Sequence, residues 1–178
     1  MKRLVLGTAL LLPVALNVIV TAQMPDHAGM PMKKSVASTE LLVTGIAGTT
    51  RTLTTADVKA LPHVTVTVHN AHSNKDESYS GVPVKELLGM VEPASGAVPR
   101  ASTNMTAVIA GATDDFHVVL AFCDINPDCR TGQAIVADMQ DGATLTKDGA
   151  FKLILTEDKK PGRWVRNLSS LTVKNVAP

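Results

Sequence analysis

The chain has 178 residues, with 17 lysines and arginines against 16 aspartates and glutamates, so its formal net charge is +1. A charge this close to zero gives no long-range attraction to nucleic acid or to an anionic membrane surface, and neither is expected as a partner. Aromatic residues make up only 3% of the chain, so valine, leucine, isoleucine and alanine must fill most of the core.

The N-terminus has the pattern of a secretory signal. Lys2 and Arg3 give a positive start, residues 4–20 are almost wholly apolar, and the small or short residues that follow suit a cleavage site. We therefore predict a signal peptide over residues 1–22 and a periplasmic or secreted product. An uncleaved membrane anchor is the alternative, although a proline and an asparagine inside the run favour cleavage. No second long apolar run follows, so we expect no membrane contact after cleavage.

Residues 23–39 are rich in methionine, proline, lysine and serine without periodicity. They predict a flexible leader ahead of one domain over residues 40–178. Thioether and imidazole groups suit copper(I), so the leader is also a candidate for weak metal binding. The candidate ligands are Met24, His27, Met30 and Met32. The alternative is an unstructured linker without a ligand.

Periodicity and turn residues predict an α+β domain of mostly strands with a few short helices. Thr54 and Asp57 have the spacing of a capping box, which predicts that a helix begins at Thr55. Polar composition predicts an exposed loop over residues 70–80. The other expected elements are helices at 55–60 and 83–90, a loop at 92–104, and strands at 41–46, 50–53, 64–69, 106–110, 116–122, 133–137, 151–156 and 168–176.

Cys123 and Cys129 are the only cysteines. Export to an oxidising compartment favours a disulfide between them. Asn126, Pro127 and Asp128 supply turn residues that close so short a ring. A redox pair or a pair of metal-ligating thiols is the alternative, but two further ligands are not obvious nearby.

The last third of the chain carries two apolar strand-like runs, a turn and a basic segment around the only tryptophan, at residues 118–122, 149–155, 141–142 and 163–168. Their order resembles the end of the oxidoreductase molybdopterin-binding domain, the fold of the sulfite oxidase family. An earlier segment, Tyr79-Ser80-Gly81-Val82-Pro83-Val84 followed by Leu87-Leu88, resembles the Gly-Val-Pro-Leu helix entry of that family. The resemblance implies a mixed, mostly-β domain.

Active members of that family bind molybdenum through a cysteine thiolate on the loop after the central strand. In this chain the matching stretch contains His69, Asn70 and His72 but no cysteine. Neutral imidazole is a poor substitute for a soft, anionic sulfur. Sulfite-oxidase-type oxygen-atom transfer is therefore not expected, and whether the chain is an enzyme stays open at this stage.

An inherited cleft is a separate expectation. A pterin cofactor carries phosphate and a hydrogen-bonding ring, so its site needs cationic side chains and a surface for stacking. The candidate ligand-binding residues are Lys152, Arg163, Trp164, Arg166, His69 and His72. The alternative is that the lysines form a solvated turn, Trp164 is a core aromatic and the two histidines are exposed loop residues.

These observations favour an exported domain that binds molybdopterin, another pterin or some other small anionic ligand without sulfite-oxidase-type chemistry. An active molybdopterin-dependent oxidoreductase with a periplasmic redox partner is the first alternative. A periplasmic copper- or metal-handling module, acting through the leader and the two histidines, is the second.

Overall fold

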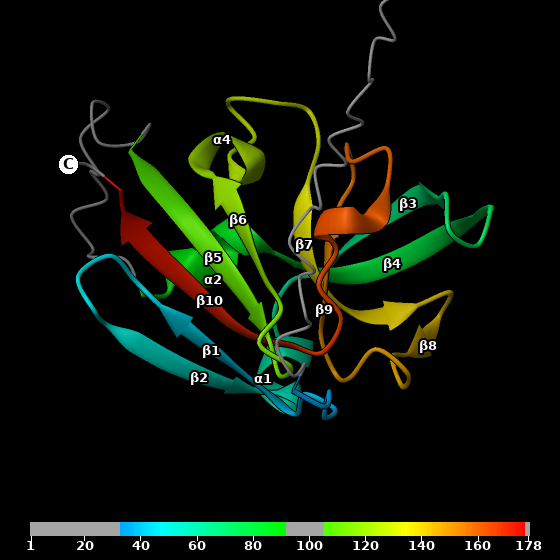
Figure 1. Ribbon diagram of the computed structural model, residues 1–178, viewed down its shortest axis with the longest axis horizontal. Helices are drawn as coiled ribbons and strands as arrows, with labels where there is room; N and C mark the ends of the chain where they lie inside the picture. Colours follow the sequence, from blue (N-terminus) through cyan, green and yellow to red (C-terminus); the bar gives the residue numbers. More distant parts are fainter. Residues whose placement is uncertain (1–32, 92–104, 177–178) are drawn as a thin grey trace, which may run out of the picture. The chain divides into compact units, whose positions relative to one another are not determined.

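The computed structural model describes residues 33–91 and 105–176, which belong to one compact unit. The predicted signal peptide, the four candidate copper ligands of the leader and the loop at 92–104 lie outside the described residues. Within the described ranges, no helix is long and apolar enough to cross a membrane. The unit is mostly β, with a few short helices, as the sequence predicts (Figure 1).

Sheet A has five strands in the order β2-β1-β10-β5-β6. All of its neighbours are antiparallel except β1 and β10, which run parallel with Leu42 opposite Ser170. The N-terminal and C-terminal strands of the domain are therefore direct neighbours (Figure 1). The strands are β1 (Glu40–Thr44), β2 (Thr50–Thr54), β5 (Thr106–Ala112), β6 (His117–Ala121) and β10 (Leu168–Asn175).

Sheet B is antiparallel and is built around β7, which pairs with β4 on one side and with β8 and β9 on the other. At Gly81, β4 lies too close to β7 for a side chain, because a Cβ there would lie 2.2 Å from the carbonyl oxygen of Val136. The strands are β3 (Val64–Asn70), β4 (Lys75–Pro83), β7 (Ala134–Gln140), β8 (Ala143–Thr144) and β9 (Lys152–Leu155).

The helices are all short. The capping box predicted for the first is present, with the Thr54 side chain accepting from the Asp57 N–H and the Asp57 carboxylate accepting from the Thr54 N–H. Pro83 precedes the second helix as its N-cap residue. The helical segments are α1 (Thr55–Lys59), α2 (Val84–Gly89), α4 (Phe122–Ile125) and the 3₁₀ turn η1 (Pro161–Arg163).

The exposed loop predicted for residues 70–80 is wrong. The chain turns at residues 71–74 and returns as β4, paired with β3 from Asn70–Lys75 to Val64–Gly81. The polar side chains misled the prediction because this hairpin extends beyond the core, where both faces of a strand carry polar residues. Asn74 permits the tight turn through its left-handed backbone, with φ of 51°.

One hydrophobic core takes side chains from both sheets. Strands β5, β7 and β9 are buried along most of their length, whereas β1 and β6 alternate between buried and exposed residues. Aliphatic side chains dominate the core, as the low aromatic content predicts. Its largest fully buried members are Tyr79, Phe151, Leu41, Leu53, Leu87, Leu120, Ile135, Leu153, Ile154, Leu168 and Leu171.

Part of the segment predicted as flexible leader is attached to the domain. Val36 exchanges hydrogen bonds with the Thr113 hydroxyl, and buried Ser38 accepts from the backbone N–H groups of Ala150 and Phe151. Val36 and Ser38, which precede the predicted domain start at residue 40, therefore contact the domain. Neither contact has a periodic signature, because both are made by backbone and small hydroxyl groups.

Gly149 packs against Ser38 in this attachment and provides a stability prediction. It has φ of 77°, and a Cβ there would lie 2.4 Å from the Asn167 side chain and 2.5 Å from the Ser38 hydroxyl. Gly149→Ala should therefore lower the free energy of unfolding by about 3 kcal/mol, combining backbone strain with displacement of these neighbours. Urea unfolding measures the change.

The matched control is Gly48→Ala. Gly48 has φ of 83°, but nothing lies within 4 Å of the added Cβ, so this variant should lose only about 1 kcal/mol from backbone strain. Equal losses in the two variants would contradict the role of Gly149 in fastening Ser38.

Candidate functional site

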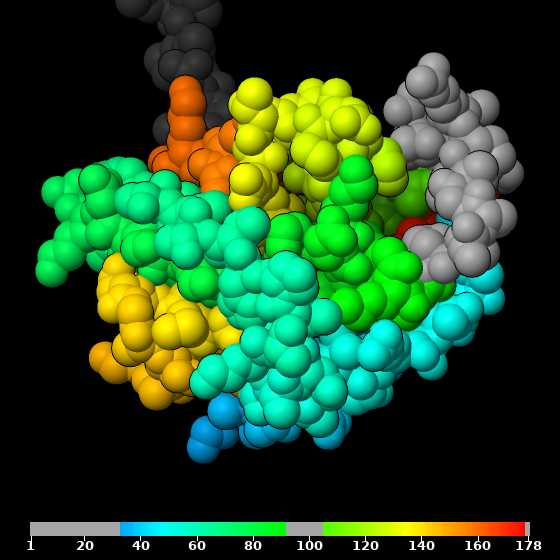
Figure 2. All heavy atoms as spheres, turned by 180° about the vertical axis from the view of Figure 1, so that it is seen from behind, coloured from blue at the N-terminus to red at the C-terminus, as the bar shows by residue number. Residues whose placement is uncertain are grey.

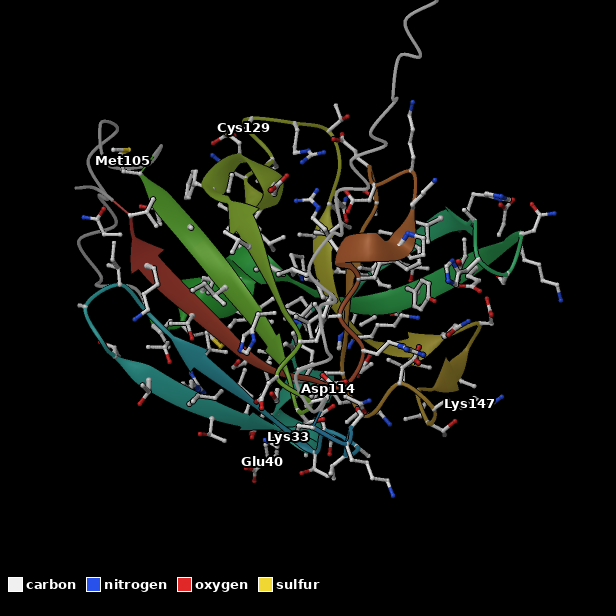
Figure 3. The ribbon with its side chains drawn as sticks, viewed as in Figure 1. Lys33, Glu40, Met105, Asp114, Cys129 and Lys147 are labelled. Carbon is white, nitrogen blue, oxygen red and sulfur yellow. A yellow bond between two sulfur atoms is a disulfide. The ribbon has the colours of Figure 1, made fainter. Side chains whose placement is uncertain are left out.

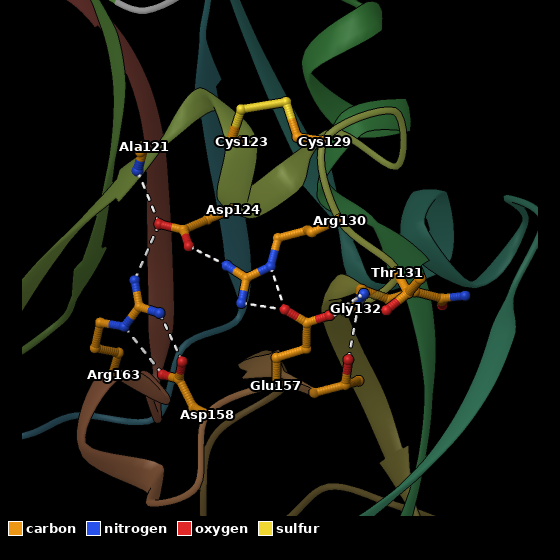
Figure 4. Close-up of polar contacts among 12 residues, drawn as sticks. Ala121, Cys123, Asp124, Cys129, Arg130, Thr131, Gly132, Glu157, Asp158 and Arg163 are labelled. Atoms are coloured by element: carbon orange, nitrogen blue, oxygen red, sulfur yellow. Dashed lines mark hydrogen bonds and ion pairs between the residues drawn. A yellow bond between two sulfur atoms is a disulfide. The ribbon is translucent and has the colours of Figure 1, made fainter.

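The Cys123–Cys129 disulfide closes a ring at the start of α4. The two Cα atoms are 5.2 Å apart and the sulfur atoms are bonded, so the predicted pairing is confirmed in the structure. Both cysteines are exposed, and of the α4 residues only Ile125 is buried. The disulfide thus lies at the surface, above a helix that contributes one side chain to the core (Figure 4).

Asp124, inside the disulfide ring, binds both arginines of an ionic network (Figure 4). Its carboxylate accepts hydrogen bonds from Arg130, from Arg163 at 3.0 Å and from the backbone N–H of Ala121 at 3.0 Å. Arg163 also donates two hydrogen bonds to Asp158, at 3.0 and 2.6 Å. The ring is therefore connected to the segment between β9 and η1.

A second connection in the same network runs through Glu157. Its carboxylate pairs with Arg130 and accepts from the Thr131 hydroxyl at 3.1 Å and the Gly132 N–H at 2.6 Å. The hydrogen bond from Arg130 holds the pKa of Glu157 below its ordinary value, against a smaller effect of burial. We call Asp124, Arg130, Glu157, Asp158 and Arg163 the arginine–carboxylate network.

The charge state of Asp124 follows from two opposing effects. Burial raises the pKa of this carboxyl group. The hydrogen bonds from Arg163 and Ala121, with the charges of Arg163 and Arg130, outweigh burial and hold the pKa below its ordinary value of 3.8. The guanidinium of Arg163 is therefore paired with Asp124 and Asp158 and is not presented to an anionic ligand.

Lys152 and Trp164 meet in a second cluster, on the side of sheet B. The Lys152 side chain is only 8% exposed. Its ammonium lies 5.8 Å from the Trp164 ring centroid and 4.9 Å from that of Tyr79. It donates to the Tyr79 hydroxyl at 2.9 Å and to Asp148 at 2.7 Å. Trp164 is buried, and its indole N–H donates to the carbonyl of Leu155.

Hydrogen bonds continue from this cluster into the β3–β4 hairpin. The Tyr79 hydroxyl donates to Glu77 at 2.6 Å, and Glu77 also accepts from Asn70 and Ser73. Burial and the bond to Glu77 raise the pKa of Tyr79 far above its ordinary value. Burial raises the pKa of Glu77, but the three donors outweigh it and the pKa is lowered. We call Glu77, Tyr79, Asp148, Lys152 and Trp164 the Lys152 cluster.

A surface hollow of about 210 Å³ adjoins the Lys152 cluster through Asp148. Arg166, which is 72% exposed, lies 4.0 Å from the same carboxylate. Lys147, on the loop between β8 and β9, is exposed and forms no ion pair with the residues that the structure describes (Figure 3). The hollow is lined by Gln140, Asp141, Ala143, Thr144, Leu145, Thr146, Lys147 and Asp148.

The predicted ligand-binding residues therefore divide into three places. Lys152 and Arg166 both contact Asp148, and Trp164 packs against Lys152. Arg163 lies in the arginine–carboxylate network. Cys129 and Lys147 mark the two regions and lie well apart in Figure 3. His69 and His72 lie at the exposed end of the β3–β4 hairpin, where His69 pairs with Asp76 at 2.8 Å.

The histidine pair gains no further metal ligand from the fold. Among the described residues, no group of three or more histidine, cysteine or acidic side chains is placed to hold a metal ion. His63, which the sequence analysis passed over, contacts the carbonyl of Leu61 at 2.7 Å and buried Asp138 at 3.1 Å. That contact joins the α1–β3 connection to β7.

A larger groove, of about 570 Å³, lies on the face shown in Figure 2, between the α1–β3 connection and α2. Its walls are mostly apolar, and Glu86 is its single charged residue. The lining residues are Leu61, Pro62, Val64, Val82, Pro83, Glu86, Gly89 and Met90. None of the cations expected to bind an anionic ligand lines it.

Comparison with known proteins supports the fold. No family model and no curated protein matches the chain. Among solved structures, it is similar to the sulfane dehydrogenase SoxCD from Paracoccus pantotrophus, with a TM-score of 0.59 and 16% sequence identity over 76% of this chain. The match spans only 38% of the dehydrogenase chain. At this level of identity, the match shows a shared fold alone.

The donor atoms present do not fit a thiolate-bound molybdenum centre. The sequence has two cysteines, and their sulfur atoms are bonded to each other. The stretch that the sequence analysis compares with the ligand loop of that family forms the end of β3 and the β3–β4 turn, with Asn70 bonded to Glu77. No step through such a centre is derived for this chain.

The arginine–carboxylate network predicts how stability depends on pH. Because the pKa of Asp124 is lower in the folded protein than in the unfolded chain, its contribution is complete above the ordinary value of 3.8 and is lost as the pH falls through the folded value. Asp124→Asn should lower the free energy of unfolding at neutral pH by about 2 kcal/mol, and by less in strong acid. Urea unfolding at both conditions measures this.

Asp128→Asn is the matched control for that measurement. Asp128 belongs to the same disulfide ring but is exposed and forms no ion pair in the described part of the chain. Its substitution should leave stability nearly unchanged at both conditions. Equal losses from the two substitutions would show that the network contributes nothing specific.

The size of the disulfide ring predicts a modest role in stability. Closing a ring of this size constrains the unfolded chain by about 2 kcal/mol. Cys123→Ser should therefore lower the free energy of unfolding by about that amount and leave the fold intact, as judged by circular dichroism. Intact-mass measurement should find no free thiol in the oxidised parent protein. Two labelled thiols in the denatured parent would contradict the pairing.

Proposed function

We propose that the chain is an exported ligand-binding domain, distantly related to the oxidoreductase molybdopterin-binding domains, that does not perform sulfite-oxidase-type chemistry. The observation that carries this is the combination of a sulfite-oxidase-like fold with the mutual bonding of both cysteines. The fold supports descent from a cofactor-binding domain. The paired sulfurs support the loss of thiolate ligation.

The site that suits this role best is the hollow beside Asp148. Lys147 supplies an exposed ammonium group at its wall. Arg166, which does not line the hollow, adds a second exposed cation 4.0 Å from Asp148. These two cations balance the carboxylates of Asp141 and Asp148, which also line the hollow. Hydroxyl and amide groups of Thr144, Thr146 and Gln140 line the same hollow. Cations with hydroxyl and amide groups fit a small anionic ligand, such as a phosphorylated pterin.

The Lys152 cluster supports one wall of this hollow through Asp148. Asp148 is held by Lys152, and Lys152 is held in turn by the Tyr79 hydroxyl and two aromatic rings. Because these groups are buried and mutually bonded, they do not need to rearrange when a ligand binds. Trp164 lies within this cluster, so its fluorescence reports events at Asp148.

Titration of the protein with a phosphorylated pterin tests the proposal. Binding should change the Trp164 emission. Lys147→Ala or Arg166→Ala should raise the dissociation constant by roughly tenfold, the usual effect of losing one charge-assisted hydrogen bond. Added salt should weaken binding to the parent protein, because exposed charges are screened over about 8–10 Å.

Lys174→Ala is the matched control, because Lys174 is an exposed lysine on β10 and does not line the hollow. It should bind as the parent does. Absence of any pterin or phosphate binding, or equal effects of all three substitutions, would contradict the site. Elemental analysis of protein purified from its native compartment should find no molybdenum, and a stoichiometric amount would contradict the proposed loss of chemistry.

A further inference from the structure

The Cys123–Cys129 disulfide is open to chemical attack in the folded protein. Both cysteines are exposed, and the ring that they close is short. Only Ile125 of α4 is buried, so the neighbouring core does not depend on the bond. A disulfide with these properties is accessible to an external thiolate without prior unfolding.

One of the two sulfurs is prepared to act as the leaving group. The side-chain amide of Asn126 donates to Cys129 Sγ, with Nδ2 and the sulfur 3.9 Å apart. Asn126 is oriented by Lys85 of α2, whose ammonium donates to its Oδ1 at 3.4 Å, and by the Asp128 N–H at 3.3 Å. A donor aimed at a sulfur stabilises its thiolate, so Cys129 should leave and Cys123 should be attacked.

Cleavage of this bond would be felt outside the ring. Asp124 lies within the ring and Arg130 directly follows Cys129, so the disulfide holds both residues in place. Through them the ring binds Glu157, which follows β9, and Arg163, the last residue of η1. We call residues 157–163 the β9–η1 segment. Opening the ring removes the covalent constraint on two of the five members of the arginine–carboxylate network (Figure 4).

We propose that Cys123–Cys129 is a thiol–disulfide exchange site for a dithiol reductant, and that its reduction loosens the β9–η1 segment. A reductant thiolate attacks Cys123 Sγ, the S–S bond breaks, and its electron pair leaves with Cys129 Sγ. The second thiol of the reductant, as a thiolate, then attacks the first reductant sulfur in the mixed disulfide. This attack releases the Cys123 thiolate. The reductant becomes a disulfide, giving two electrons and two protons to the two cysteines. This inference does not rest on the proposed ligand.

Dithiothreitol acting on the native, full-length protein tests the exchange. Alkylation followed by intact-mass measurement should show two modified thiols without denaturant, and an oxidant should restore the disulfide. Circular dichroism should stay unchanged. Hydrogen exchange of the amides from Glu157 to Arg163 should become severalfold faster on reduction, while that of β7 amides should not. A disulfide that reacts only after unfolding, or a β9–η1 segment whose exchange stays the same, would overturn the proposal.

Variants test the direction of attack. Asn126→Ala and Lys85→Ala should each slow reduction severalfold, because Cys129 loses its donor or the residue that orients it. Lys59→Ala removes an exposed lysine from the last turn of α1, and its disulfide should be reduced at the parent rate. Cys123→Ser/Cys129→Ser should show fast exchange at the β9–η1 segment with or without dithiothreitol. Equal rates in the parent and Asn126→Ala would refute the assigned leaving group.

Discussion

The buried ammonium of Lys152 is the charge around which one end of the domain is organised. A lone cation at 8% exposure would cost several kcal/mol, so its surroundings have to supply an opposite charge and hydrogen-bond acceptors. Asp148 gives the charge and the Tyr79 hydroxyl gives an acceptor. Tyr79 then needs an acceptor of its own, which Glu77 provides. Requirements that begin at one residue of β9 thus fix side chains on β4 and on the β8–β9 loop.

The same logic separates the cationic residues into structural and available groups. Arg163 and Lys152 form ion pairs with carboxylates of low exposure. Lys147 and Arg166 are exposed beside Asp148. Proximity in sequence did not reveal this division, because Arg163 and Arg166 flank one tryptophan yet contact different acidic residues. The acidic residues near these cations in the sequence, including Asp158 and Asp148, could have indicated which cations are paired.

Much of the fold was predictable from local patterns, since strand alternation, the Thr54–Asp57 capping box and the cysteine spacing all act over a few residues. The Gly-Val-Pro segment was recognised by resemblance, and the structure supplies its reason in the close approach of β4 to β7 at Gly81. The β3–β4 hairpin was missed because its end extends past the core and carries no apolar alternation. The Lys152 cluster was missed in part because it joins residues more than 70 positions apart.

The position of β10 also determines the order in which the domain can be completed. This strand lies between β1 and β5, so sheet A remains in two separate halves until β10 is inserted. β1 and β10 lie far apart in the sequence, and such contacts form slowly because a long loop must close first. Insertion of β10 is therefore the step that joins the two halves into one sheet.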